Sequence, residues 1–81
     1  MTTSEAKKDA STRLAKAGIS FKKLSAKTES FEGFGYGTCV FVSIYEATIG
    51  ALPCPIQTMQ QAFTDVPKPS LGGYVACLAW T

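Results

Sequence analysis

The first apolar positions of the chain recur at the spacing of one face of a helix. They are Ala6, Ala10, Leu14 and Ala17. We expect a helix from Ser4 to Ala17, because Thr2 and Glu5 fit the reciprocal N-terminal capping pattern and Gly18 suits a left-handed C-terminal cap. The apolar stripe is thin and its side chains are small, so this helix should lie close to a sheet.

Two strand patterns follow the helix. Residues Ile19 to Thr28 alternate as a half-exposed edge strand, in which a bulge at Lys22 and Lys23 would restore the apolar face. Residues Thr38 to Tyr45 are apolar on both faces, which is typical of a central, well-covered strand. The two segments should form an antiparallel hairpin with a long loop.

The second half of the chain contains shorter elements. Residues Glu46 to Pro55 should be irregular, and a short helix from Pro55 or Ile56 to Phe63 would bury Ile56, Met59 and Phe63 on one face. The apolar run from Tyr74 to Trp80 should be a buried strand.

The element order is therefore helix, strand, strand, short helix, strand. We predict an α+β fold in which residues 1–81 form one small domain. Its sheet should have three strands, mostly antiparallel, with the helices packed on one face. Two thin helices cannot cover both faces of that sheet, so an exposed apolar patch is expected.

Composition argues against catalysis. The chain has no histidine, which is the commonest general base and neutral metal ligand. Its three cysteines, Cys39, Cys54 and Cys77, form no Cys-x-x-Cys pair of the kind that structural zinc sites use. We expect buried, reduced thiols, although Cys39 and Cys77 could join in a disulfide if their strands are neighbours. We therefore predict a protein that is not an enzyme and needs no cofactor or metal.

The net charge of +2 is unevenly distributed. Residues 1–32 carry every basic residue except Lys68, whereas the rest of the chain carries few charges. The polar start of the chain lacks the apolar region of a signal peptide, and no apolar stretch is long enough to span a membrane. These features predict a cytoplasmic protein.

Glycine and aromatic residues alternate from Gly33 to Gly37. This segment resembles the middle of the RNA-recognition signature, in which rings on a central strand stack on bases. Gly33, Phe34, Gly35 and Tyr36 match that signature, but Glu32 stands where a basic residue belongs. The first strand of that family is also missing. Nucleic-acid binding through Phe34, Tyr36 and the basic strand therefore remains the alternative to protein binding.

Protein interfaces favour aromatic residues at their centre and polar residues at the rim. The chain offers four rings near its central loop, namely Phe31, Phe34, Tyr36 and Tyr45, together with nearby lysines. We predict partner binding by a set that consists of Lys22, Lys23, Lys27, Phe31, Phe34 and Tyr36.

The stretch from Leu14 to Thr28, followed by Ser30-Phe31 and Val40-Phe41-Val42, resembles small accessory proteins of phages and mobile elements. Anti-CRISPR proteins are one group among them. The resemblance implies a stoichiometric inhibitor of a host protein complex, such as a CRISPR effector, in the cytoplasm of a bacterial host. Many DNA-mimicking inhibitors are strongly acidic, whereas this chain is slightly basic, so steric blocking of a protein surface is expected. A phage structural or assembly protein, which would self-associate, is a further alternative, and a homodimer is compatible with each of these functions.

Overall fold

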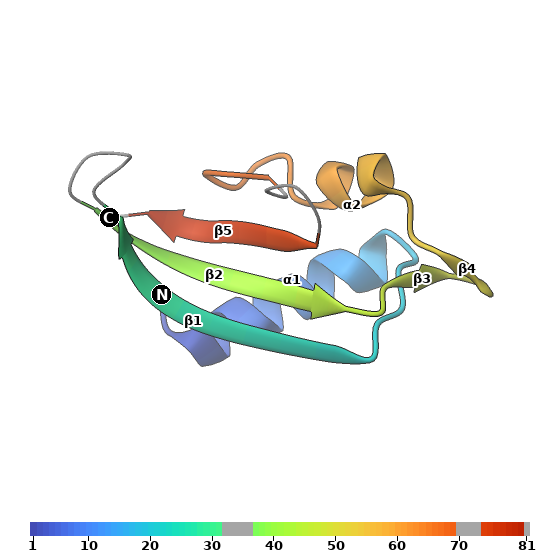
Figure 1. The fold of residues 1–81 in the computed structure, drawn as a ribbon, viewed down its shortest axis with the longest axis horizontal. Helices are drawn as coiled ribbons and strands as arrows, with labels where there is room; N and C mark the ends of the chain where they lie inside the picture. Colours follow the sequence, from blue (N-terminus) through green and yellow to red (C-terminus); the bar gives the residue numbers. More distant parts are fainter. Residues whose placement is uncertain (32–36, 70–73, 81) are drawn as a thin grey trace.

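The chain folds in the predicted order around a three-stranded antiparallel sheet (Figure 1). The computed structural model describes residues 1–31, 37–69 and 74–80, and of Phe31 only the backbone. Its elements are α1 (Thr3–Lys16), β1 (Lys23–Phe31), β2 (Gly37–Tyr45), β3 (Thr48–Ile49), β4 (Leu52–Pro53), α2 (Ile56–Ala62) and β5 (Val75–Trp80). The strand order β1-β2-β5 puts β2 in the centre. The predicted α+β class is confirmed.

Local signals set both ends of α1. The Thr2 hydroxyl accepts a hydrogen bond from the Glu5 amide at 3.1 Å, and the Glu5 carboxylate accepts one from the Thr2 amide at 2.8 Å. At the other end Gly18 has a φ of +73°. The amide of Ile19 then donates to the Leu14 carbonyl at 2.9 Å, which completes a Schellman motif. The predicted caps are confirmed.

The core lies on one side of the sheet. The side chains of Ala6, Ala10 and Leu14 are fully buried, and they form one cluster with Val42 of β2 and with residues from α2 and β5. Small alanine side chains allow α1 to lie close against the strands. Met59 and Phe63, from α2 and the residue after it, are buried in the same cluster, so both helices lie on this face.

Two predictions about the first hairpin need correction. The strand β1 begins at Lys23 rather than at Ile19, because the chain bends at Lys22. Ser20 instead makes an isolated bridge to Thr48. The bend replaces the bulge that we expected at Lys22 and Lys23, and after it Leu24 and Ala26 lie on the core side.

The segment predicted to be irregular contains a small second sheet. Strands β3 and β4 pair antiparallel, and Gly50 between them has a φ of +62°, which a glycine adopts without strain. The prediction for α2 is also partly wrong. Met59 and Phe63 are buried as expected, but Ile56, the first residue of α2, is 40% exposed.

The register of β5 against β2 shifts in the middle of the pair. Val40 lies opposite Ala79 and Phe41 lies opposite Cys77, so Leu78 is the extra residue of a bulge. The bulge lets Leu78 and Ala79 both contribute to the core side. Beyond β5, Lys68 makes an isolated bridge to Cys77, so a further segment borders this edge.

Cys39 and Cys77 form a disulfide between β2 and β5, with their Cα atoms 6.1 Å apart. The expectation of reduced thiols is therefore wrong for these two residues and right for Cys54, which is free and buried.

Disulfides persist in oxidising environments, whereas the cytosol keeps thiols reduced. The cytoplasmic location stays a prediction, and the disulfide counts against it. Among the described residues, no helix is long and apolar enough to cross a membrane.

Reduction of this disulfide should destabilise the protein. The bond joins residues 38 positions apart, and a loop of that length corresponds to about 3–4 kcal/mol of stabilisation in the chain-entropy model. Urea unfolding followed by circular dichroism should show this loss both after reduction and in a Cys39→Ala/Cys77→Ala variant. Thiol titration of the unreduced, unfolded chain should find only Cys54. Three reactive thiols would contradict the disulfide.

Candidate functional site

The sheet has a face that points away from both helices, which we call the outer face. In Figure 1 the sheet lies in front of α1, and this face is turned toward the reader. Alternation along the strands and the cross-strand register assign positions to it. These positions are Lys23, Ser25, Lys27, Glu29 and Phe31 of β1, Gly37, Cys39, Phe41, Ser43 and Tyr45 of β2, and Val75, Cys77 and Trp80 of β5.

The structure brings together only part of the predicted binding set. Lys23 and Lys27 lie on the outer face, and Phe31 has its backbone position there. Lys22 precedes the strand, where its amide donates to the Tyr45 carbonyl at 3.0 Å. Phe34 and Tyr36 lie outside the described residues.

Each of the three lysines has a partner within the protein. The Lys22 ammonium lies 3.5 Å from a carboxylate oxygen of Glu46, and Lys27 is paired with Glu29. The Lys23 ammonium lies 5.5 Å from the centre of the Tyr45 ring, within the range of a cation–π contact. The hydrogen bond from Lys27 to Glu29 also raises the pKa of Lys27. These lysines are exposed, but none stands as an isolated positive charge.

Tyr45 is a site residue that the predicted set omits. Its side chain is 45% exposed at the end of β2, and the Ser25 hydroxyl donates to its phenolic oxygen at 3.4 Å. That hydrogen bond, with the nearby Lys23 charge as a smaller cause, lowers the pKa of Tyr45. The sequence offered a signal, since Tyr45 ends the outward alternation of the strongest strand. Lys23 and Ser25, however, become neighbours of Tyr45 only through the pairing of β1 with β2.

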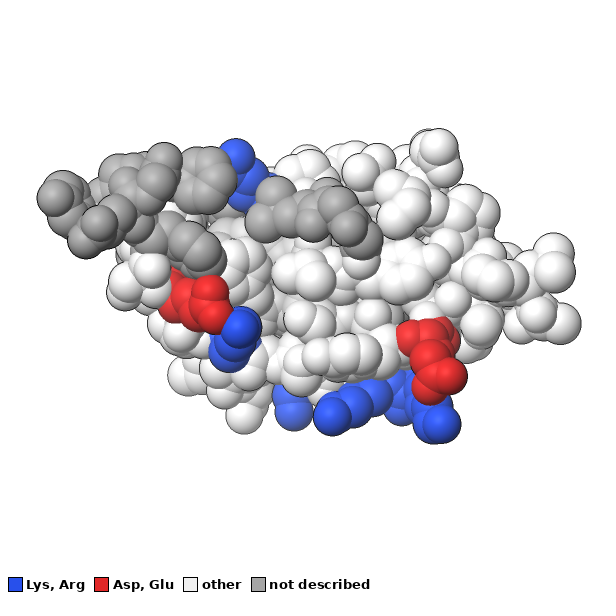
Figure 2. Space-filling view, in the orientation of Figure 1, with Lys and Arg blue, Asp and Glu red and all other residues white. Residues whose placement is uncertain are grey.

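The middle of the outer face carries little charge. Figure 2 shows uncharged residues over the centre of this face, with basic and acidic side chains mainly along its lower border, where β1 runs in Figure 1. The described positions at the centre are Phe41 and Ser43 of β2 and Val75 of β5, which are partly exposed, and the disulfide-bonded Cys39 and Cys77, which are buried. An uncharged centre with a charged border is the usual arrangement of a protein interface.

Trp80 lies across the outer face at Gly37. A Cβ atom added to Gly37 would stand 2.5 Å from two carbon atoms of the Trp80 ring. This position therefore requires glycine for the close approach of the indole rather than for an unusual backbone conformation. Trp80 also lies opposite Cys39 in the pairing of β2 with β5, and Cys39 forms the disulfide that joins these two strands.

A Gly37→Ala substitution should displace the indole and destabilise the protein by about 1–3 kcal/mol, the usual cost of overpacking. Trp80 is the only tryptophan, so its fluorescence reports this contact directly. We expect a changed emission spectrum and a lower urea midpoint. Gly50→Ala, at a position with no atoms within 4 Å of the added Cβ, should leave the emission spectrum unchanged. An unchanged spectrum in Gly37→Ala would contradict the packing described.

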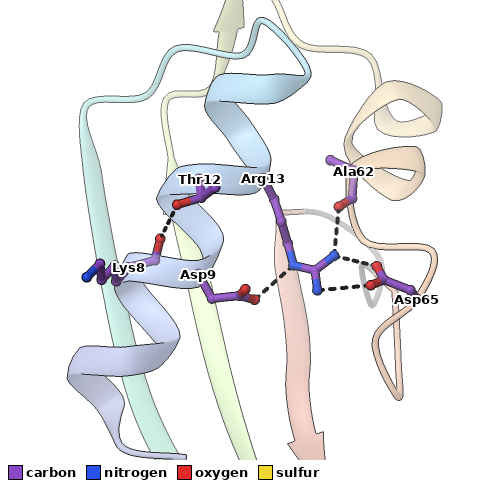
Figure 3. Close-up of polar contacts among 6 residues, drawn as sticks. All are labelled: Lys8, Asp9, Thr12, Arg13, Ala62 and Asp65. Atoms are coloured by element: carbon purple, nitrogen blue, oxygen red, sulfur yellow. Dashed lines mark hydrogen bonds and ion pairs between the residues drawn. The ribbon is translucent and has the colours of Figure 1, made fainter.

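A second polar cluster joins the two helices on the other side of the molecule (Figure 3). Arg13 of α1 donates from Nε to Asp9 at 2.8 Å and from its terminal nitrogens to Asp65 and to the Ala62 carbonyl. Its guanidinium also lies 5.9 Å from the centre of the Phe63 ring. The cluster borders a groove of about 420 Å³ between α1 and α2.

The residues that border this groove hold the two helices together. Four of the five N–H groups of Arg13 are engaged by acceptors of the protein, and two of these acceptors are carboxylates. An anion would therefore meet one free N–H group and two negative charges. The arrangement ties α2 to α1 and offers little to a ligand.

The Arg13–Asp65 pair should make stability depend on acid pH. Hydrogen bonds from Arg13 lower the pKa of Asp65 in the folded protein. The stabilisation is therefore complete above the unfolded pKa of about 4, and it is lost as the pH falls through the lower folded pKa. In Asp65→Asn the urea midpoint should therefore decrease less steeply as the pH falls below about 4.

An Arg13→Met background provides the control for this prediction. There Asp65 has lost its partner, so Asp65→Asn should change the acid dependence much less. Equal effects of Asp65→Asn in both backgrounds would show that the pair does not couple stability to pH.

No other cluster among the described residues suggests chemistry. Within residues 1–31, 37–69 and 74–80, no three histidine, cysteine, aspartate or glutamate side chains are grouped so that they could hold a metal ion. Comparisons of the chain with protein-family models, curated proteins and solved structures found no match. The outer face is therefore the candidate functional site on its geometry alone.

Proposed function

We propose that this protein is a non-enzymatic module that binds another protein through the outer face of its sheet. The observation that carries the proposal is the position of this face, which points away from both helices and has the exposed Tyr45 ring beside an uncharged centre. Tyrosine is among the residues that contribute most to protein interfaces, because a large, stiff ring loses little entropy on binding.

The proposed interface changes the predicted site in one respect. Tyr45 joins Lys23 and Lys27, which border the uncharged centre, while Lys22 lies at the end of the strand beside Glu46. Charged residues around an apolar centre contribute to partner choice and to the rate of association more than to affinity. Phe31, Phe34 and Tyr36 remain predicted members of the interface.

The finer form of the proposal concerns the partner. The resemblance of the first half of the chain to phage and mobile-element proteins supports an inhibitor that sterically blocks a host protein complex, such as a CRISPR effector subunit. The near-neutral outer face agrees with this mode, because a mimic of nucleic acid would need a dense array of negative charge.

The arrangement of the lysines favours a protein partner over nucleic acid. A phosphate contact by Lys22 or Lys27 would compete with an existing carboxylate, and Lys23 lies over Tyr45. Binding to nucleic acid would also weaken steeply with salt, because each phosphate contact releases a counterion.

Tyr45→Ala should weaken partner binding about tenfold or more, as expected for an exposed interface tyrosine, with little loss of stability because the ring is half exposed. The tagged chain is used to capture partners from a bacterial lysate with and without nuclease, and the affinity for the purified partner is then measured. Leu52→Ala is the matched control, since Leu52 is 71% exposed on the β3–β4 hairpin, away from the outer face.

Three outcomes would overturn the proposal. Loss of the partner after nuclease treatment, with binding abolished by Lys23→Ala and Lys27→Ala, would indicate a nucleic-acid-binding protein. A greater effect of Leu52→Ala than of Tyr45→Ala would place the interface on the hairpin. Unfolding of Tyr45→Ala would show that the ring is part of the structural core.

A further inference from the structure

Strand β1 offers a second surface for association, at its free edge. Within the part of the chain that the structure describes, β1 pairs only with β2, so its other edge carries no strand ladder. This edge runs along the lower border of the sheet in Figure 1. An unpaired edge presents backbone donors and acceptors on which another strand can add.

The edge is long and lacks the usual barrier of a proline. It spans nine residues, Lys23–Phe31, and contains no proline. Lysines at sheet edges often prevent association, because like charges meet when two copies approach. Here Glu29 follows Lys27 on the same face, so the edge carries both signs of charge two positions apart.

This charge pattern is complementary to itself. We propose that two copies of the chain pair antiparallel through β1, with Thr28 opposite Thr28 of the other copy. Lys27 of each copy then lies opposite Glu29 of the other, and the intrachain pairs become a group of four charges that alternate in sign. Opposite charges directly across a strand pair stabilise it. The proposal rests on the pairing of strand edges and not on the function proposed for the outer face, although Lys27 belongs to both surfaces.

Neighbouring registers are less favourable. A shift by one residue on one strand would set outward positions against core-side positions, so only even shifts keep both faces consistent. An axis at Lys27 would place Lys27 against Lys27, and an axis at Glu29 would place Glu29 against Glu29. An axis at Ala26 avoids like charges, but it pairs Glu29 with Lys23 and leaves Lys27 opposite Ser25.

The core-side positions of β1 also suit this pairing. Around the axis, Thr28 faces Thr28 and Ala26 faces Ser30, and these small side chains are partly or fully exposed in the single chain. Cross-strand threonine pairs are favourable. Three strands from each copy would form one continuous sheet, with both outer faces on the same side and both copies of α1 on the other.

Charge reversal tests the register directly. Sedimentation equilibrium at low salt should show a reversible dimer of the wild-type chain. Lys27→Glu and Glu29→Lys should each weaken the dimer about tenfold or more, because each puts like charges across the axis. An equimolar mixture of these two variants should recover the dimer, and so should the double variant Lys27→Glu/Glu29→Lys.

Control measurements separate this mechanism from other effects. Lys7→Glu changes the net charge as Lys27→Glu does, but it lies on α1 and should leave the dimer intact. Circular dichroism establishes that each variant is folded. If the double variant does not dimerise, the Thr28 axis is excluded. The double variant distinguishes the registers, because at an Ala26 axis the Glu29→Lys substitution would put a second positive charge opposite Lys23. A wild-type chain that stays monomeric up to about 1 mM, the range of weak affinities, would overturn the proposal.

Discussion

The structure depends on a core that can be built on only one face of the sheet. The part of the chain that the structure describes has one long helix and one short helix, and both bury the side of β2 that carries Val40, Val42 and Ile44. The alanines of α1 make this possible, because small side chains bring the helix backbone close to the strands. Within residues 1–31, 37–69 and 74–80, no helix covers the opposite face.

Long-range links then hold the elements of the second half of the chain in place. The disulfide joins β5 to β2, Arg13 holds Asp65 and the end of α2 against α1, and the Tyr74 hydroxyl donates to the Cys54 carbonyl. Each link joins residues far apart in sequence and restrains an element too short to be stable alone. The Trp80 ring, which lies across Gly37, packs the end of β5 onto the outer face in the same way.

The same constraint explains where association can occur. Among the described residues, the sheet has a face without a helical cover and an edge without a paired strand, and both are surfaces that other proteins can use. Here the two differ in character, since the outer face has an uncharged centre with Tyr45 at its border, whereas the β1 edge carries Lys27 and Glu29 in alternation. The face suits a different protein, and the edge suits a second copy of the chain.

The sequence by itself determined the elements that local signals define. The capping box, the apolar stripe of α1, Gly18, the strand β2 and the short helix α2 all follow from residues within one or two turns or strand repeats of each other. Tertiary structure decided the rest. Ser20 pairs with Thr48 rather than extending β1, and the disulfide depends on β2 and β5 being neighbours. The cluster of Tyr45, Lys23 and Ser25 likewise exists only through cross-strand register, because pairing between distant segments is set by the packing of the whole core.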